Sequence, residues 1–418
     1  MKLTARMAYF LVGIFTVWVI SGLTSPPSSR RAGSMGTPHL GDGGLPQFQK
    51  DPDWPKLPSK WRMGFGSAVA IDSQDHVWIL SRPRGLAHPR STAPDLTSTP
   101  APPVIEFDND GNFLQGWGGE SGPGYQWPSN EHSINVDYKG FVWILGNADG
   151  KENNPADLPN DNQILKFTKD GKFVFAIGKS GQAGSNATEV LRGATGIRVY
   201  PKTNELFVSD GYGNSRVMVY DADTGKFKRM WGAYGNKPLD RDARPPRSKS
   251  MQSELCPSMC DVWEALQQFA VPHDLAISDD GLVYVSDRGN KRVQVFTTEG
   301  KFIAEQFVGL DSKNYLQARS TAFSPDQRFL YVSGSPVTYI LNRKTLEVLG
   351  SFDTGSEQEH PPGHQIAADH KGNIYEVQAE LTGADGKSGG AGAYKFVFKG
   401  YSPAATCPPC QSTRSVYK

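Results

Sequence analysis

Three histidines begin similar short segments of the chain. His132 opens HSINVD, His273 opens HDLAIS and His364 opens HQIAAD, and each segment is mostly apolar and ends near a turn. If these segments occupy equivalent places in alternate repeats of a closed circular fold, the three imidazoles converge on one point. Three nitrogen ligands with an open fourth position are typical of a catalytic zinc site.

Six consecutive segments share the pattern that would position these histidines. Each has an apolar strand, a turn, an aromatic-rich strand, a third strand and a hairpin into a fourth, as in TGIRVY, ELFVSD, RVMVY and GKFKRMWG. Turns such as DNDGN, TKDGK and TTEGK place Gly and Asp where hairpins need positive φ. Six four-stranded units of roughly 40 to 50 residues predict an all-β fold, a six-bladed β-propeller whose first strands line a central channel.

The first strands of the six segments align in one column of residues. In chain order this column contains Ser67, His132, Thr195, His273, Arg319 and His364. The chain has eight histidines, and chance does not readily place three of them at alternate positions of one column. The alternative is that each is a buried histidine with ordinary hydrogen-bond partners.

A second column lies where the second strand of a blade ends. WILSR ends in Arg82, YVSDR ends in Arg288, and the third segment carries an extra residue, Tyr212, within SDGYGNSR. Arginine holds a carboxylate by two hydrogen bonds, and a phenol beside cations can act as a base. The alternative is local pairing of each arginine with an aspartate and a turn-capping role for the tyrosine.

These motifs resemble a known family. FVSDGYGNSR and FAVPHDLAIS…YVSDRGNKRVQVF are similar to NHL repeats, and more narrowly to peptidyl-α-hydroxyglycine α-amidating lyase, the lyase domain of peptidylglycine α-amidating monooxygenase. The resemblance spans roughly residues 62–400. It implies a six-bladed propeller with one zinc that converts a peptidyl-α-hydroxyglycine to a peptide amide and glyoxylate.

The resemblance also implies roles for individual residues. His132, His273 and His364 match its zinc ligands, Tyr212 matches its proposed base, and Arg82 and Arg288 match its functional arginines. One departure follows the third ligand, where the family has an aspartate that helps to bind calcium and this chain has Gln365. We therefore expect calcium binding to be weak or absent.

Composition and the chain ends suggest the domain organisation. We expect a signal peptide or N-terminal anchor in residues 1–25, a Pro/Ser/Gly-rich linker in 26–61, the propeller in 62–400 and a tail with CPPC in 401–418. The apolar run at 7–23 predicts a secreted, periplasmic or membrane-anchored protein that faces outside. Cys256 with Cys260, and Cys407 with Cys410, are candidate disulfides, with a redox or metal role for CPPC as the alternative. Insertions at 86–102 and 236–265 are candidate channel caps.

Several functional hypotheses remain open. A net charge of +1 without a basic stripe excludes nucleic acid as an expected partner. We expect a monomer that acts on a small molecule or peptide with a carboxylate, with a possible membrane tether at its N-terminus. The first hypothesis is a zinc lyase. The alternatives are a non-catalytic NHL-type propeller that binds a protein or glycan, and a metal-dependent hydrolase of lactones or esters.

Overall fold

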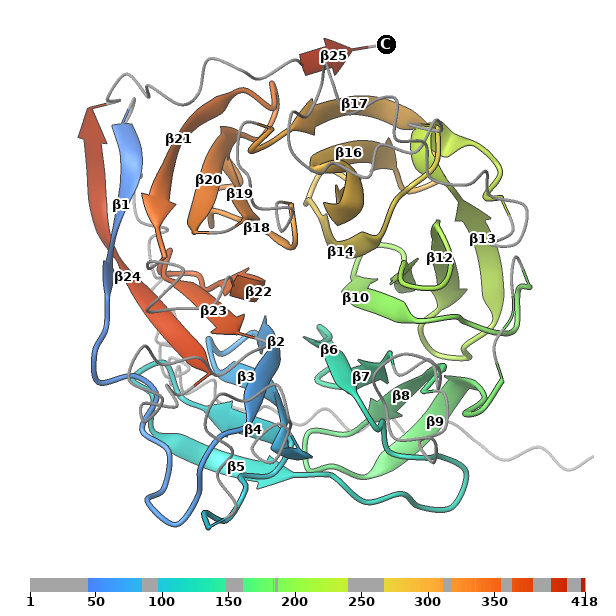
Figure 1. Cartoon of the computed structure of the whole chain (residues 1–418), viewed down its shortest axis with the longest axis vertical. Helices are drawn as coiled ribbons and strands as arrows, with labels where there is room; N and C mark the ends of the chain where they lie inside the picture. Colours follow the sequence, from blue (N-terminus) through green and yellow to red (C-terminus); the bar gives the residue numbers. More distant parts are fainter. Residues whose placement is uncertain are drawn as a thin grey trace, which may run out of the picture. The chain divides into compact units, whose positions relative to one another are not determined.

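The computed structural model contains six antiparallel sheets arranged around a central axis (Figure 1). It describes residues 44–84, 97–147, 161–182, 184, 187–239, 267–310, 318–334, 336–354, 363–378, 392–403 and 415–417. The chain divides into two compact units, and every described residue belongs to the second unit, Thr37–Lys418. The expected all-β, six-bladed propeller is confirmed.

Each blade pairs its strands in order from the axis outward, and the first three blades are built from consecutive segments. Blade 1 contains β2 (Phe65–Ile71), β3 (Val77–Arg82), β4 (Val104–Phe107) and β5 (Phe113–Trp117). Blade 2 contains β6 (Glu131–Val136), β7 (Val142–Gly146), β8 (Gln163–Phe167) and β9 (Phe173–Gly178). Blade 3 contains β10 (Ala194–Tyr200), β11 (Glu205–Asp210), β12 (Arg216–Asp221) and β13 (Phe227–Trp231), and the short 3₁₀ helix η2 (Ala233–Gly235) follows it.

The remaining blades continue this order, and two of them gain a strand from a distant part of the chain. Blade 4 contains β14 (Pro272–Ile277), β15 (Leu282–Asp287), β16 (Arg292–Thr297), β17 (Phe302–Phe307) and β25 (Ser415–Tyr417), with η4 (Arg288–Asn290) after β15. Blade 5 contains β18 (Thr321–Phe323), β19 (Phe329–Ser333), β20 (Val337–Asn342) and β21 (Val348–Asp353). Blade 6 contains β22 (Gly363–Ala368), β23 (Ile374–Gln378), β24 (Ala393–Pro403) and β1 (Gly44–Lys50).

Strand β1 closes the ring, because it forms the outer strand of blade 6 beside β24. Sequence analysis assigned residues 26–61 to a linker. The part of this range that forms β1 belongs to the propeller instead. Residues 401–418 were assigned to a tail, yet β24 extends to Pro403 and β25 pairs with β17. Because β1 precedes blade 1 in the chain, its backbone pairing with β24 holds the first and last blades together.

Apolar clusters fill the spaces between neighbouring sheets, and each combines side chains from two adjacent blades. The second strand of every blade directs one aromatic side chain toward the next blade. These residues are Trp78, Trp143, Phe207, Tyr284, Tyr331 and Tyr375. Full burial of a large apolar side chain contributes on the order of 1.5–3 kcal/mol, so this packing fixes the inner strands that position the histidines.

Candidate functional site

Five of the six column residues share a structural feature at the inner end of their blades. In blades 1, 2, 3, 4 and 6 the pairing of the two innermost strands skips the column residue, as between Glu131 and Ser133 around His132. Such a bulge adds one residue to a strand and re-aims its side chain. Blade 5 differs, because β18 begins at Thr321, after Arg319. The bulges therefore explain why these five side chains depart from the usual alternation of side chains between the two faces of a strand.

The three histidines of the column come together as the sequence predicts. Their ring centroids lie 5.1 Å apart for His132 and His273, 4.6 Å for His132 and His364, and 4.8 Å for His273 and His364. One nitrogen from each ring lies within 4.8 Å of the others, and all three residues are buried. This arrangement could hold a metal ion, and we call it the three-histidine layer.

Each imidazole is oriented by a backbone carbonyl of the following blade. The Nδ1 atoms lie 2.7 Å from the Thr195 oxygen for His132, 2.7 Å from the Arg319 oxygen for His273, and 2.5 Å from the Ser67 oxygen for His364. Because a carbonyl only accepts, each Nδ1 carries the hydrogen and each Nε2 keeps its lone pair. Metal-binding histidines commonly show this second hydrogen bond, which fixes the ring and its tautomer.

Electrostatics keep these imidazoles neutral. Burial lowers the pKa of His132 and of His273 well below the usual value. The Arg82 and Arg288 guanidinium groups lower the pKa of His132 further, and Arg288 does the same for His273. Burial likewise lowers the pKa of His364, with added effects from the other two imidazoles. A neutral imidazole is the form that binds a metal, so protons do not compete for the Nε2 atoms at neutral pH.

Tyr212 covers one side of the three-histidine layer. Its hydroxyl oxygen lies 3.1 Å from Nε2 of His273 and 3.3 Å from Nε2 of His132. The loop after β11 holds it, because its backbone N–H donates to the Gly193 oxygen at 3.0 Å. The phenol is therefore within hydrogen-bond reach of the point where the imidazoles converge.

The two predicted arginines lie at the same end of the channel. Nη1 of Arg288 donates to the Tyr212 hydroxyl at 3.2 Å, and its guanidinium carbon lies 5.2 Å from the centre of the Tyr212 ring. Nε of Arg82 donates to the backbone oxygen of Glu131, the residue before His132, at 2.6 Å. The structure thus brings all six predicted site residues to one place, while their catalytic and metal-binding roles remain predictions.

Two buried ion pairs support the loops that carry Tyr212 and Arg288, and sequence analysis missed them. Asp210 accepts a hydrogen bond from Nε of Arg216 at 2.9 Å, and Asp287 accepts one from Nε of Arg292 at 2.8 Å. Asp287 also accepts from the Ala270 N–H at 2.8 Å, just before the strand of His273. The available signal was the similarity of SDGYGNSR and SDRGNKR, in which an arginine follows the aspartate after a short turn and the first motif is longer by one residue.

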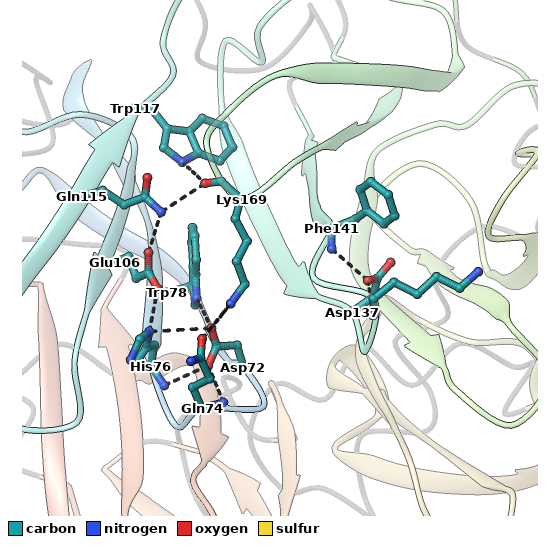
Figure 2. A network of polar contacts seen from close by, with 11 residues as sticks. Asp72, Gln74, His76, Trp78, Glu106, Gln115, Trp117, Asp137, Phe141 and Lys169 are labelled. Atoms are coloured by element: carbon teal, nitrogen blue, oxygen red, sulfur yellow. Dashed lines mark hydrogen bonds and ion pairs between the residues drawn. The ribbon is translucent and has the colours of Figure 1, made fainter.

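A second group of ligand-type residues lies at the opposite ends of the inner strands, in blade 1. Asp72, His76 and Glu106 also place their ligand atoms within 4.8 Å of one another. Figure 2 shows Nζ of Lys169, from blade 2, reaching Asp72, with 2.7 Å between Nζ and the carboxylate. His76 lies 2.8 Å from Glu106, so internal partners already occupy this group.

The position expected to lack a calcium ligand lies directly after His364. Nε2 of Gln365 donates to the Thr195 oxygen at 3.4 Å. The neighbouring Asp274 carboxylate accepts from Ser320 at 2.5 Å and pairs with Arg198 at 3.2 Å. Both partners bind Oδ2 of Asp274, and the expectation about calcium stays a prediction.

Other sequence expectations fall on residues outside the described part of the chain. These are the N-terminal apolar run, both cysteine pairs and most of the two insertions. Within the described ranges, no helix is long and apolar enough to cross a membrane.

Comparison with known proteins agrees with this architecture. The NHL repeat model matches residues 269–296, which include His273, Asp287 and Arg288. The chain is a six-bladed β-propeller that contains an NHL repeat. It is 27% identical over 383 residues to rat peptidylglycine α-amidating monooxygenase, covering 84% of this chain and 33% of the relative.

Two further relatives show the range of the similarity. The propeller is 27% identical over 168 residues to the probable peptidyl-α-hydroxyglycine α-amidating lyase of Caenorhabditis elegans, covering 40% of this chain and 36% of the relative. It is 24% identical over 317 residues to mouse NHL repeat-containing protein 3, covering 74% and 72%. The chain spans about a third of the length of the amidating monooxygenases it matches.

Proposed function

We propose that this propeller is a zinc-dependent lyase that cleaves the C–N bond of a peptidyl-α-hydroxyglycine-like substrate and yields an amide and glyoxylate. The observation that carries the proposal is the three-histidine layer with the Tyr212 hydroxyl 3.1 Å and 3.3 Å from two of its Nε2 atoms. The similarity to amidating monooxygenases supports the reaction class. No oxidant or reductant is required, because the reaction only redistributes electrons between the C–N and C–O bonds.

The histidines fit a zinc ion on their own chemistry. Three neutral imidazoles with fixed Nδ1–H groups leave three nitrogen donors directed toward one point. Within the described residues, no cysteine, carboxylate or further histidine joins this group as a fourth ligand. Zinc bound there would supply Lewis acidity that polarises substrate oxygens.

The protein side chains would move the proton and hold the substrate. Tyr212, acting as a phenolate, would accept the proton of the substrate hydroxyl. The C–N electrons would then pass to nitrogen, and the hydroxyl carbon would become the aldehyde of glyoxylate. The same proton then returns to the departing nitrogen, which leaves as an amide. Arg288 donates a hydrogen bond to the Tyr212 oxygen, and Arg82 and Arg288 would bind the carboxylate.

The direct experiment incubates the purified chain with an N-acyl-α-hydroxyglycine and measures glyoxylate and amide in equal amounts. The matched substrate is the methyl ester, which lacks the carboxylate charge. We expect release from the acid to be faster than from the ester. A zinc-loaded chain that releases neither product would contradict the proposal.

The alternative function is that of a non-catalytic NHL-type propeller that binds a protein or glycan. Mouse NHL repeat-containing protein 3 is similar over 72% of its own length, at an identity close to that of the amidating monooxygenases, so overall similarity does not select the lyase. A propeller that only binds a partner would retain zinc and release no glyoxylate. A lactone or ester hydrolase would instead consume lactone or ester with Tyr212 dispensable.

The proposed setting of the reaction is outside the cytoplasm. The apolar run at residues 7–23 supports export, with the propeller either released or tethered. Cell fractionation with external protease treatment tests this, and a protease-resistant cytoplasmic protein would contradict it.

A further inference from the structure

Blade 5 breaks the pattern of the column. The other two non-histidine residues are small, and their hydroxyls donate to carbonyls of the next blade: Ser67 to the Glu131 oxygen at 2.7 Å and Thr195 to the Pro272 oxygen at 2.6 Å. Blade 5 has the long, charged Arg319 at this position, and it is only 6% exposed. Burying a guanidinium is costly, so its presence where a hydroxyl suffices elsewhere calls for a reason.

Blade 6 breaks the repeat at a second position. The residue after the aromatic of the second strand is apolar in five blades: Ile79, Ile144, Val208, Val285 and Val332. In blade 6 it is Glu376, which is 2% exposed. Its Oε2 is buried and has no hydrogen-bond partner among the residues that the structure describes.

A third change makes room for this glutamate beside the three-histidine layer. Gly363 precedes His364, and a Cβ added to Gly363 would lie 2.3 Å from the carboxyl carbon of Glu376. The two other histidines of the layer follow residues with side chains, Glu131 and Pro272. The Glu376 carboxyl therefore packs against the backbone immediately before a candidate ligand.

The charge of Arg319 acts both on Glu376 and on the three-histidine layer. Arg319 is the strongest charge that acts on Glu376, and its guanidinium acts on His132, His273 and His364 alike. Its backbone oxygen also accepts the Nδ1–H of His273. Arg319 thus comes from within the layer itself, whereas Arg82 and Arg288 approach from the ends of second strands.

We propose that Arg319 is a third arginine of the site, which binds the carboxylate of the anion held over the three-histidine layer, and that Glu376 is the residue that positions it. The choice of a hydroxy-acid substrate rests on the proposed lyase function. The anion-binding role rests on the paired departures from the repeat. A planar guanidinium offers a carboxylate two parallel hydrogen bonds, which a serine or threonine cannot do.

The repeat itself supplies the variants that test this role. The double variant Arg319→Thr, Glu376→Val restores the residue types of the other blades at both positions. Thr195 and three valines already occupy these two positions in other blades, so this variant is expected to fold. Arg343→Thr in the same blade is the control, because Arg343 is equally buried at 6% exposure and binds Asp280 away from the site.

The measurement is the calorimetric affinity of the zinc-loaded chain for glycolate, with uncharged glycolamide as the matched probe. We expect the wild type to prefer glycolate, and the double variant to bind glycolate about ten- to a hundredfold more weakly with glycolamide affinity unchanged. Zinc content stays the same, and the Arg343→Thr control keeps the preference. If Arg319→Thr alone folds poorly with Glu376 left in place, Arg319→Lys provides the second variant, with a smaller loss expected.

Three outcomes would overturn the proposal: a wild type without preference for glycolate, a double variant that retains wild-type glycolate affinity within twofold, or an equal loss for both probes. The lyase proposal fails separately. If the wild type releases no glyoxylate but the double variant loses glycolate binding, the anion-binding role stands and the lyase function does not.

Discussion

Two groups in this propeller place three metal-ligating side chains within 4.8 Å of one another, yet their surroundings are opposite. In the three-histidine layer, carbonyls accept the Nδ1–H groups and the Nε2 atoms face one another across the axis. In blade 1, Asp72 is bound by Lys169 and His76 by Glu106 (Figure 2). Ligand type and proximity are therefore insufficient to define a metal site.

The difference lies in what neutralises the polar atoms. The blade 1 group contains its own cation, since Lys169 lies where a metal would otherwise balance the buried Asp72 carboxylate. In the three-histidine layer, the neighbouring charges are arginines, which keep the imidazoles neutral and favour an anion above them. We conclude that the blade 1 group is structural and that the three-histidine layer has the donors of a metal centre.

The sharpest way to break this comparison is to remove one histidine from each group. His273→Ala should abolish both zinc binding and glyoxylate release, because two imidazoles remain. His76→Ala should leave zinc content and turnover unchanged. Elemental analysis of the purified chains, together with the glyoxylate assay, measures both. Equal zinc content in wild type and His273→Ala would show that the layer holds no metal.

A smaller loss is expected when the base is removed and the layer stays intact. Tyr212→Phe should lower turnover by about 10² to 10⁴, the usual contribution of a positioned acid–base group, with zinc content unchanged. Tyr138→Phe is the control, because the Tyr138 side chain is exposed and its hydroxyl donates to Asn204 away from the site. Unchanged turnover in Tyr212→Phe would remove the phenol from the reaction.

The blade 1 group can be tested through stability. Lys169→Met should lower the free energy of unfolding by about 1–2 kcal/mol, since it leaves the Asp72 carboxylate without its cation. Lys172 in the same turn pairs with an exposed aspartate, so Lys172→Met should change stability little. Thermal unfolding with turnover measured in parallel separates the two, and lost activity in Lys169→Met would argue against a purely structural role.

The smallest expected effect is a difference in pH dependence between two buried carboxyls. Hydrogen bonds, chiefly from Lys169, outweigh burial and lower the pKa of Asp72, so its contribution to stability is present above its ordinary pKa and is lost as the pH falls through the lowered value. Burial raises the pKa of Glu376 to about 8, so its contribution is present at acidic pH and is lost as the pH rises toward 8.

Thermal unfolding between pH 5 and pH 9 measures the predicted loss of stability from Glu376, because its raised pKa of about 8 falls inside this range. Glu376→Gln should lessen the decline in stability toward alkaline pH. If stability declines as steeply in Glu376→Gln as in the wild type, other titratable groups cause the alkaline loss of stability.

Much of the fold was predictable because its signals are local. Hairpin turns such as TKDGK recur at regular spacing, and the bulges preserve one alignable residue per inner strand, so the column of His132, His273 and His364 could be found without the structure. Tyr212 was detectable as one extra residue in a repeat.

The missing parts depend on distant contacts. Strand β1 pairs with β24, near the other end of the chain, and nothing within Gly44–Lys50 identifies that partner. The contact between Lys169 and Asp72 crosses from one blade to the next, and the electrostatic effect of Arg319 on Glu376 does the same. Sequence patterns within one repeat cannot show contacts of this kind.

The most direct test of the central claim is a zinc titration of the metal-free chain with glyoxylate release as the readout. The account predicts no release without metal, a rise with added zinc, and saturation at one zinc per chain. The His132/His273/His364 triple alanine variant should stay inactive throughout. Full activity of the metal-free chain, or a zinc-saturated chain that forms no glyoxylate, would contradict the account.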